Sequence, residues 1–486
     1  MAEIVDSDSL LGWRWDHSYA RLPGVFFRET LPTPVRQPRL VVLNGPLAAE
    51  LGLEAALSEN PAIFAGNEIP QGALPIAQAY AGHQFGNFTN LGDGRAILLG
   101  EHLTPSGQRV DIQLKGPGRT SYSRGGDGRA ALGPMLREYI ISEAMHGLGI
   151  PTTRSLAVAT TGDIVARTAL LDGAVLTRVA ASHLRVGTFQ YAAALQDPTA
   201  LQALADYSLD RHFPELVDEE NRYLKFFQAI MERQAALLAQ WLHVGFIHGV
   251  MNTDNMAISG ETIDYGPCAF MNDYDPDTVF SSIDRNGRYA YGNQPSIARW
   301  NLARLAETLL PLFHPDREVA ATLGNEALAG YDQLFQAYWL RGMRAKLGLG
   351  DDHAEDAALV QGLLDWMHIN HQDYTTTFRK LSDEEAIHEP LFIDTDFINW
   401  HERWASRLAG QPEAEAAARM KAHNPAVIPR NHLVEAALQA ATEEQDFCVM
   451  ERLLGALATP FAESVAEEYT APPPPSGEVY QTFCGT

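Results

Sequence analysis

The chain has 486 residues, 46% of them hydrophobic, so it can bury a sizeable core and is too long for one average domain. Its 36 Lys and Arg residues stand against 61 Asp and Glu residues, which gives a formal net charge of −25. A chain this acidic repels nucleic-acid phosphates and anionic lipid, which excludes a general nucleic-acid or membrane-surface binder.

The cysteines and the start of the chain indicate a compartment. Cys268, Cys448 and Cys484 are too few for a disulfide framework and contain no Cys-x-x-Cys pair for zinc. The opening residues are acidic and lack the basic and apolar regions of a secretory signal. No run of about 18 apolar residues is present, so no transmembrane helix is expected. We therefore predict a soluble protein of the reducing cytoplasm.

The first half of the chain predicts strands around one helix. The first 80 residues are irregular and rich in proline, which indicates an extension packed on its neighbours. Residues 110–115 alternate with period two, and Lys115 falls on the face opposite the apolar side chains. A loop rich in Gly and Arg follows, and helical periodicity then runs from Pro134 to Gly147.

Two hairpins are expected next, one from 155 to 168 around Thr161-Gly162-Asp163 and one from 170 to 179 around Asp172-Gly173. Beyond them the chain is mostly helical, with amphipathic helices predicted over 223–241, 300–310 and 327–347. This order predicts an α+β chain made of an extension (1–80), a strand-rich lobe (81–179), a larger helical lobe (180–470) and a Pro-led tail (471–486).

Positive charge gathers in the strand-rich part. Between residues 81 and 190, eleven basic residues stand against eight acids, so this stretch is +3 while the rest of the chain is −28. Ten of the eleven are Arg, whose planar fork suits phosphate or carboxylate. The pattern fits either a solvated loop region with scattered charges or a site for a compact, highly charged anion.

The stretch from 246 to 266 carries the densest set of chemical groups. A loop with His248, Asp254 and Asn255 is followed by a predicted short hairpin over 256–263, and Asp264 comes directly after it. Asn255 and Asp264 then lie at the two ends of one hairpin and converge. An amide oxygen and a carboxylate suit Mg²⁺ held together with substrate phosphates. For any one of these residues alone, an Asx turn is the simpler explanation.

This order of residues resembles the protein-kinase signature. Lys115 corresponds to the strand lysine, Glu138 to its helix partner with Glu143 as the alternative, and Asp264-Tyr265-Gly266 to the metal-binding triplet. Two features depart from that signature. Val250 stands where kinases carry the catalytic Asp, and no G-x-G-x-x-G precedes the lysine strand. Transfer of a γ-phosphoryl group is therefore doubtful.

The chain resembles the selenoprotein O (SelO/YdiU) family of kinase-like protein adenylyltransferases over nearly its whole length. The motifs that carry the resemblance are Gly92-Asp-Gly94-Arg95, Gln113-Leu-Lys115-Gly-Pro-Gly, Arg124-Gly-Gly-Asp127-Gly128-Arg129, Arg178, Arg185, HGVMNTDN at 248–255 and IDYG at 263–266. The Cys-Gly-Thr terminus is similar to bacterial members, in which sulfur at Cys484 replaces the selenocysteine of eukaryotic members.

The resemblance implies a protein-kinase-like bilobal fold and transfer of AMP from ATP to Ser, Thr or Tyr hydroxyls of proteins, with release of pyrophosphate. It implies that nucleotide is bound by Gly92, Gly94, Arg95, Lys115, Asp127, Gly128, Arg178, Arg185 and Asp264. By the same resemblance, Asn255 and Asp264 hold Mg²⁺ (or Mn²⁺). The resemblance further implies that Lys115, Glu138 and Asp254 are the catalytic residues, with Asp254 as proton acceptor. A structural carboxylate that steers the loop is the alternative for Asp254.

The cysteines allow a further hypothesis. Cys268 lies two residues after Gly266, and Cys484 lies on the tail behind the proline run. A disulfide between them would clamp the tail over the site as a redox switch, in line with the redox control that the family resemblance implies. Two unpaired thiols are the alternative, since a reducing cytosol disfavours pairing. Cys448 sits in a helical pattern and is expected to be a buried core thiol.

Three functions remain open from the residues alone: an AMP transferase on proteins, a kinase-like phosphotransferase, and a nucleotide-binding pseudokinase that works as a scaffold. UMP transfer also stays open, because none of the quoted residues obviously recognises the base. The sequence identifies neither the target proteins nor the oligomeric state.

Overall fold

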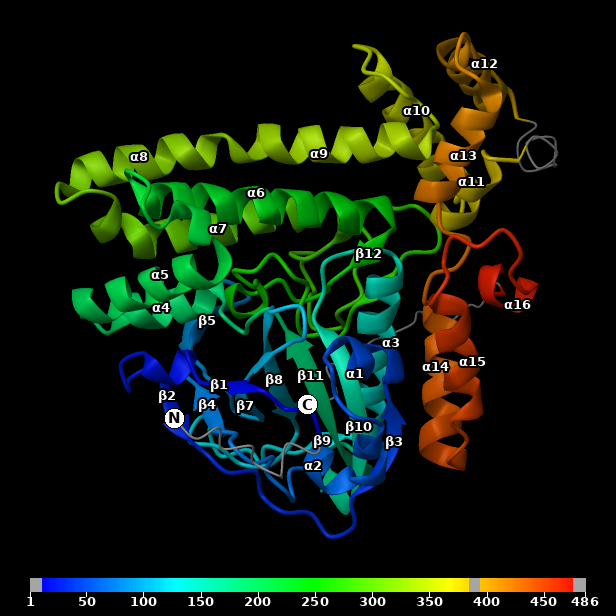
Figure 1. Ribbon diagram of the computed structural model, residues 1–486. Helices are drawn as coiled ribbons and strands as arrows, with labels where there is room; N and C mark the ends of the chain where they lie inside the picture. Colours follow the sequence, from blue (N-terminus) through cyan, green and yellow to red (C-terminus); the bar gives the residue numbers. More distant parts are fainter. Residues whose placement is uncertain (1–10, 384–393, 475–486) are drawn as a thin grey trace.

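The computed structural model describes residues 11–383 and 394–474 of the chain. It confirms the predicted α+β class: a large antiparallel sheet with helix α3 lies on one side of the molecule, and a stack of long helices lies on the other (Figure 1). None of the helices in the described ranges has the length and hydropathy that crossing a membrane requires.

The main sheet runs β2-β4-β7-β8-β11-β10-β3, with β1 beside β7 and β9 beside β11. Its strands are β1 (Trp15–Asp16), β2 (Phe27–Glu29), β3 (Arg39–Leu43), β4 (Ile76–Gln78), β7 (Ala96–Leu103), β8 (Arg109–Lys115), β9 (Ala130–Ala131), β10 (Arg154–Ala166) and β11 (Leu170–Ala180). Four of these strands precede residue 81. The described residues before 81 are therefore built into the sheet, and the expectation of an irregular extension was wrong there.

The two faces of the sheet are covered differently. Helices α1 (Gly45–Glu50) and α2 (Pro61–Ala65) pack on the face that carries Ile112 and Leu114, and α3 (Leu132–Gly147) packs on the other. The period-two alternation of β8 therefore places Lys115 on the α3 side, as predicted. Pro134 sits in the first turn of α3, where its missing N–H costs no hydrogen bond.

The predicted hairpins differ from the observed ones. Residues 154–180 form a single long hairpin, β10–β11, whose turn lies at 167–169. The expected turn at Gly162 is instead a bulge inside β10, where the register shifts between Thr160 and Ile164 and Gly162 has φ +71°. Asp172-Gly173 lies within β11, because Gly173 pairs with Ala131 of β9 and continues the ladder.

The helical part contains the stretch from 246 to 266. Its elements are α4 (Val186–Ala194), α5 (Pro198–His212), α6 (Arg222–His243), α7 (Gln294–Phe313), α8 (Arg317–Ala329), α9 (Tyr331–Lys346), α10 (Asp356–Ile369), α11 (Tyr374–Lys380), α12 (Thr395–Leu408), α13 (Glu413–His423), α14 (Asn431–Gln439), α15 (Cys448–Leu457) and α16 (Glu467–Thr470). The helix predicted over 327–347 is divided at Gly330, where α8 ends and α9 begins. Short paired strands are β5 (Ala81–Gln84) with β6 (Asn87–Asn90), and β12 (Phe246–Ile247) with β13 (Ala269–Phe270).

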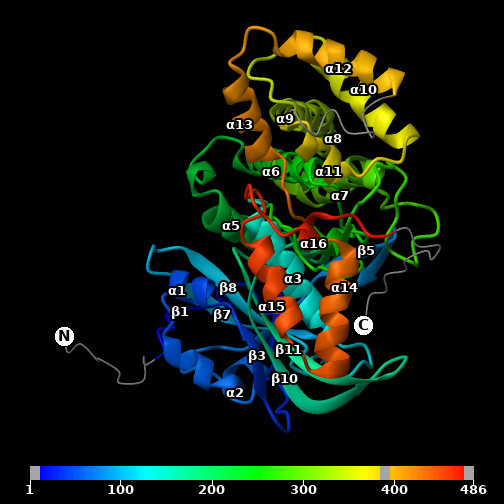
Figure 2. The ribbon, with the colours of Figure 1, turned by 90° about the vertical axis from the view of Figure 1, so that its right-hand side faces the viewer.

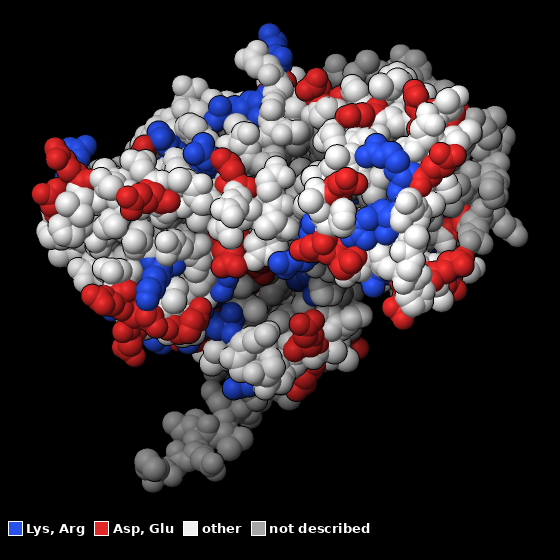
Figure 3. Space-filling model, turned by 90° about the horizontal axis from the view of Figure 1, so that it is seen from above, with Lys and Arg blue, Asp and Glu red and all other residues white. Residues whose placement is uncertain are grey.

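The last helices return to the sheet side of the molecule. Helices α14 and α15 pack beside α3, as Figure 2 shows. Cys448 opens α15 with its side chain exposed, so the expectation of a buried core thiol was wrong: it faces away from the buried Met450 and Leu453 of the same helix. The face over the helices, seen in Figure 3, carries acidic and basic side chains interspersed, so the net negative charge is not gathered there in one patch.

Candidate active site

A buried ion pair joins the sheet to α3. Lys115 is the last residue of β8, and its Nζ lies 2.6 Å from Oε2 of Glu138, with both side chains almost fully buried. Burial alone would raise the pKa of Glu138, but Arg178 and Lys115 together hold it below its usual value. The alternative partner, Glu143, binds Arg154 instead.

Asp264 joins this pair from the helical side. Its Oδ1 accepts hydrogen bonds from Lys115 Nζ at 2.5 Å and from Arg178 Nη2 at 3.2 Å, while Arg178 Nε also donates to Glu138 at 2.8 Å. Burial would raise the pKa of Asp264, but Lys115, Arg178 and Arg95 hold it well below its usual range. Asp264 is therefore ionised at neutral pH, and its backbone is left-handed (φ +66°).

The residues present fit a divalent ion. Both cations bind Oδ1 of Asp264, no described residue bonds to Oδ2, and the side chain is 28% exposed. Asn255 donates its amide N–H to the carbonyl of Val250 at 3.0 Å, so its amide oxygen is the remaining ligand atom. The described residues contain no group of three or more His, Cys, Asp or Glu side chains that could hold a metal ion, so an ion here would complete its shell with phosphate oxygens or water. Mg²⁺ prefers such a mixed shell.

The loop between these two residues is held by long-range contacts. His248 is buried and its Nε2 lies 2.9 Å from the carbonyl oxygen of Ile263, the residue before Asp264. The hairpin expected over 256–263 is absent: Ala257 bridges Arg185, and Thr262 bridges Thr152. Residues 257 and 262, which lie between Asn255 and Asp264 in the sequence, are thus held by neighbouring segments rather than by a local hairpin.

Asp254 lies next to Asn255 in a short 3₁₀ turn and is buried. Its carboxylate accepts the side-chain amide of Gln84 on both oxygens, at 2.9 and 3.0 Å. Burial raises the pKa of Asp254 to about 6, the negative charge of Asp264 adds to that rise, and Arg185 opposes it. A carboxylate with a raised pKa is a better proton acceptor than an ordinary one.

The glycine loop before β7 packs under a second loop. A Cβ at Gly92 would overlap the ring of Tyr122, and a Cβ at Gly94 would lie 2.9 Å from the Tyr122 carbonyl oxygen. Glycine is therefore required for this close approach. The guanidinium of Arg95 makes no hydrogen bond or ion pair with any described residue, yet it helps to lower the pKa of Asp264. It is thus a nearby cation available to an anion.

Asp127 and Gly128 lie in the loop that folds back on the end of β8. Gly118 donates its N–H to the Gly128 carbonyl at 3.1 Å, and a Cβ at Gly128 would overlap Gly118. Asp127 forms two 2.9 Å bonds with Arg167, and these bonds hold its pKa below the usual value. Within the described residues no contact joins Asp127 to Lys115 or Asp264.

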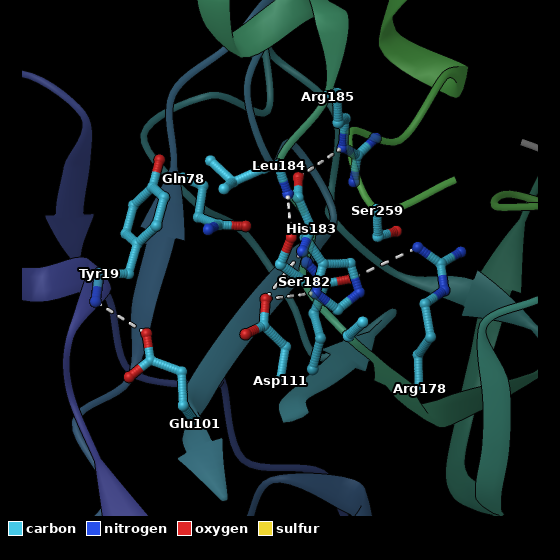
Figure 4. A network of polar contacts seen from close by, with 12 residues as sticks. Tyr19, Gln78, Glu101, Asp111, Arg178, Ser182, His183, Leu184, Arg185 and Ser259 are labelled. Carbon is cyan, nitrogen blue, oxygen red and sulfur yellow. Dashed lines mark hydrogen bonds and ion pairs between the residues drawn. The ribbon is translucent and has the colours of Figure 1, made fainter. Parts of the chain in front are cut away.

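Arg185 lies where the chain passes from β11 into α4. It is buried, donates from Nη1 to the Asp254 carbonyl at 3.0 Å, and its guanidinium lies 4.4 Å from the ring centroid of Tyr80. Figure 4 shows the segment between β11 and α4 from close by. His183 lies between Arg178 and Arg185, and its ring is bonded to Asp111. Arg178 therefore binds the carboxylate of Asp264, and Arg185 binds the backbone carbonyl of Asp254.

Cys268 is fully buried, and burial raises the pKa of its thiol to about 12. Its partner in the redox hypothesis, Cys484, lies outside the described residues. The pairing stays a prediction, and it requires Cys268 to become accessible.

Comparison with known proteins identifies the family. Residues 10–458 match the family model described as protein adenylyltransferase SelO. The chain belongs to the SelO family. It is 62% identical over 481 residues to the protein nucleotidyltransferase YdiU of Brevibacillus brevis, which covers 98% of each chain. It is likewise 62% identical to the YdiU protein of Geobacillus kaustophilus (98% and 99% covered) and 57% identical to that of Nitrosococcus oceani (98% of each).

Sequence reasoning missed part of the site of this SelO-family chain. The β5–β6 hairpin supplies Gln84 to Asp254, Tyr80 stacks on Arg185, and the buried carboxylate of Asp93 lies 3.9 Å from Arg185. The run Ala81-Gly-His-Gln-Phe-Gly-Asn-Phe, with two glycines among aromatic residues, was the one available signal of a tightly packed hairpin.

Proposed function

We propose that this chain is a protein adenylyltransferase with a protein-kinase-like bilobal fold, transferring AMP from ATP to a Ser, Thr or Tyr hydroxyl of a protein and releasing pyrophosphate. Membership in the SelO family supports this proposal. The observation that carries it is the buried network of Lys115, Glu138, Arg178 and Asp264, combined with aliphatic Val250 at the position of the kinase base. The chain thus has the lysine–glutamate pair and the metal-binding aspartate of the kinase signature and lacks the kinase base.

Asn255 and Asp264 would hold Mg²⁺ (or Mn²⁺) with the nucleotide, and the bound ion would neutralise charge on the phosphates. Lys115 and Arg95 then supply positive charge from the sheet side. Because phosphoryl-type transfer depends mainly on positioning and charge neutralisation, these residues matter more than a strong base.

The remaining nucleotide contacts are proposed along both loops of the sheet lobe. Gly92 and Gly94 allow the backbone to approach the phosphates closely, and Asp127 with Gly128 lines the second loop. Arg178 and Arg185 complete the proposed set. For Arg178, whose N–H groups already bind Glu138, Gln113 and Asp264, a contact with phosphate needs a rearrangement of this network.

In the proposed step, the acceptor hydroxyl oxygen forms a bond to the α-phosphorus and the bond from that phosphorus to the bridging oxygen of the β-phosphate breaks. The hydroxyl proton passes to the carboxylate of Asp254, and pyrophosphate leaves with the bonding electron pair. The kinase-like alternative, attack at the γ-phosphorus, would release ADP instead.

One experiment separates these reactions. The protein is incubated with candidate acceptor proteins, Mg²⁺ or Mn²⁺, and ATP labelled at either the α- or the γ-phosphate. Label from the α-phosphate on protein, with an adduct of AMP mass, is the expected result. Label from the γ-phosphate would make the chain a phosphotransferase, and labelling from neither position would leave a nucleotide-binding scaffold. A parallel incubation with labelled UTP decides whether UMP is also transferred.

A further inference from the structure

The β5–β6 hairpin docks on the catalytic loop through consecutive contacts. The backbone N–H of His83 donates to Thr253 Oγ1 at 2.7 Å, and the backbone N–H of Phe85 donates to Asn252 Oδ1 at 3.0 Å. Between them, Gln84 extends its side chain to Asp254. Three successive hairpin residues thus bind three successive residues of the loop.

Gln84 contacts the carboxylate in a defined way. A carboxylate only accepts hydrogen bonds, so the NH₂ group of Gln84 faces it, and this nitrogen lies 2.9 and 3.0 Å from the two oxygens of Asp254. From the same hairpin, Gly82 packs so closely that a Cβ there would overlap Asp254 Oδ1. The carboxylate is therefore confined between the backbone of Gly82 and the amide of Gln84.

We propose that Gln84 is a positioning residue, whose amide holds the Asp254 carboxylate in the orientation that receives the proton of the acceptor hydroxyl. This inference rests on the proposed function, in which Asp254 is the proton acceptor. The hairpin does not need the Gln84 side chain to stay docked on the loop, because the backbone N–H groups of His83 and Phe85 already bind the loop. A change of the Gln84 side chain leaves these two hydrogen bonds in place.

The test compares Gln84→Leu with the wild type and with Asn87→Ala, an exposed position on β6. Leu keeps the bulk of the side chain and removes the amide. We expect Gln84→Leu to lower kcat about 10- to 100-fold, the range for a misplaced catalytic group. The KM for ATP, the affinity for Mg·ATP and the thermal midpoint should stay within about 2-fold or a few degrees of the wild type, and Asn87→Ala should behave as the wild type.

An unchanged kcat in Gln84→Leu would overturn the inference, and so would an equal loss of Mg·ATP affinity, which would make Gln84 a nucleotide contact. The assay uses ATP labelled at either phosphate. If the wild type transfers the γ-phosphate, the proposed function is wrong, but the inference on Gln84 is still tested by the ratio of the kcat of Gln84→Leu to that of the wild type. If the wild type transfers neither label, a crystal structure of Gln84→Leu decides: the Asp254 carboxylate should rotate, and an unmoved carboxylate refutes its positioning by Gln84.

Discussion

At the scale of single residues, the site is a balanced set of four charges. Lys115 and Arg178 stand against Glu138 and Asp264, and both cations bind the same oxygen of Asp264. A divalent ion on the other oxygen would add positive charge, which the nucleotide phosphates then neutralise. Only Asp264 of the four has substantial exposure, so it is the point at which the buried network meets solvent.

We expect Asp264→Ala to abolish transfer and Lys115→Met to lower kcat/KM by about 100-fold or more, because each removes charge that acts on the phosphates. In both variants Glu138 keeps Arg178 as a partner, so the fold should survive. The measurement is α-label transfer with thermal unfolding as a check. Asp275→Ala, at an exposed carboxylate, is the matched control; wild-type rates in either site variant would refute the site assignment.

The two described cysteines differ in reactivity. Cys448 is exposed, whereas Cys268 is fully buried and burial raises its thiol pKa to about 12. Since the thiolate is the reactive form, iodoacetamide should label Cys448 in the native protein and leave Cys268 unlabelled, as read by peptide mass spectrometry. In denaturant without reductant, labelling of Cys268 indicates a free thiol. Labelling only after reduction would support the redox switch, and fast native labelling of Cys268 would contradict its burial.

At the scale of elements, sequence periodicity predicted the helices and strands whose position depends on their own hydrophobic pattern. β8, α3 and α6 follow their hydrophobic patterns to within a few residues. The choice of Glu138 over Glu143 also follows from helix geometry, because residues five apart point about 140° away from each other. The prediction of a hairpin over 256–263 was wrong because the backbone hydrogen bonds of this stretch go to residues 151–153 and 184–186. No local pattern in the sequence reveals these partners. Gln84 was missed for the same reason.

Lys346, at the end of α9, offers a prediction on pH. It is buried over the rings of Tyr374 and Phe378, and burial lowers its pKa from 10.5 to about 7. The unfolded chain therefore binds a proton that the folded chain lacks between pH 7 and 10, so the contribution of Lys346 to stability rises with pH in that window. Below pH 7 its buried charge destabilises the fold.

We expect Lys346→Met to be more stable than the wild type at pH 7, with an advantage that shrinks by about 1 kcal/mol per pH unit between pH 7.5 and 9.5. Urea unfolding at several pH values measures this slope. Lys421→Met, at an exposed pair with Glu463, is the control variant and is measured under the same conditions. A constant difference between Lys346→Met and wild type would mean that Lys346 keeps its ordinary pKa in the fold.

At the scale of the whole molecule, buried arginines link α3 and the sheet to other segments on both sides of the site. On one side, Arg137 of α3 donates to the Cys268 carbonyl at 2.8 Å and to Asn431 of α14 at 2.7 Å. On the other, Arg211 of α5 binds Asp111 of β8 at 2.6 Å and lies 3.5 Å from Glu101 of β7. The site lies between the contacts of Arg137 and those of Arg211, so its geometry depends on the relative placement of sheet and helices.

The contacts of Arg211 can be tested alone. Glu101 also accepts the N–H groups of Ser18 and Tyr19, so the N-terminal segment, the sheet and α5 meet at this point. Arg211→Met removes the cation that binds the buried carboxylates of Asp111 and Glu101. Removing one partner of a buried pair costs about 3–5 kcal/mol, whereas an exposed pair contributes about 1 kcal/mol or less. Arg222→Met, one helix further along at the partly exposed pair with Asp206, is the matched control. Urea unfolding should therefore show a large loss of stability in Arg211→Met and almost none in Arg222→Met. Equal losses would mean that the junction is held by apolar packing and that Arg211 contributes no more than a surface charge.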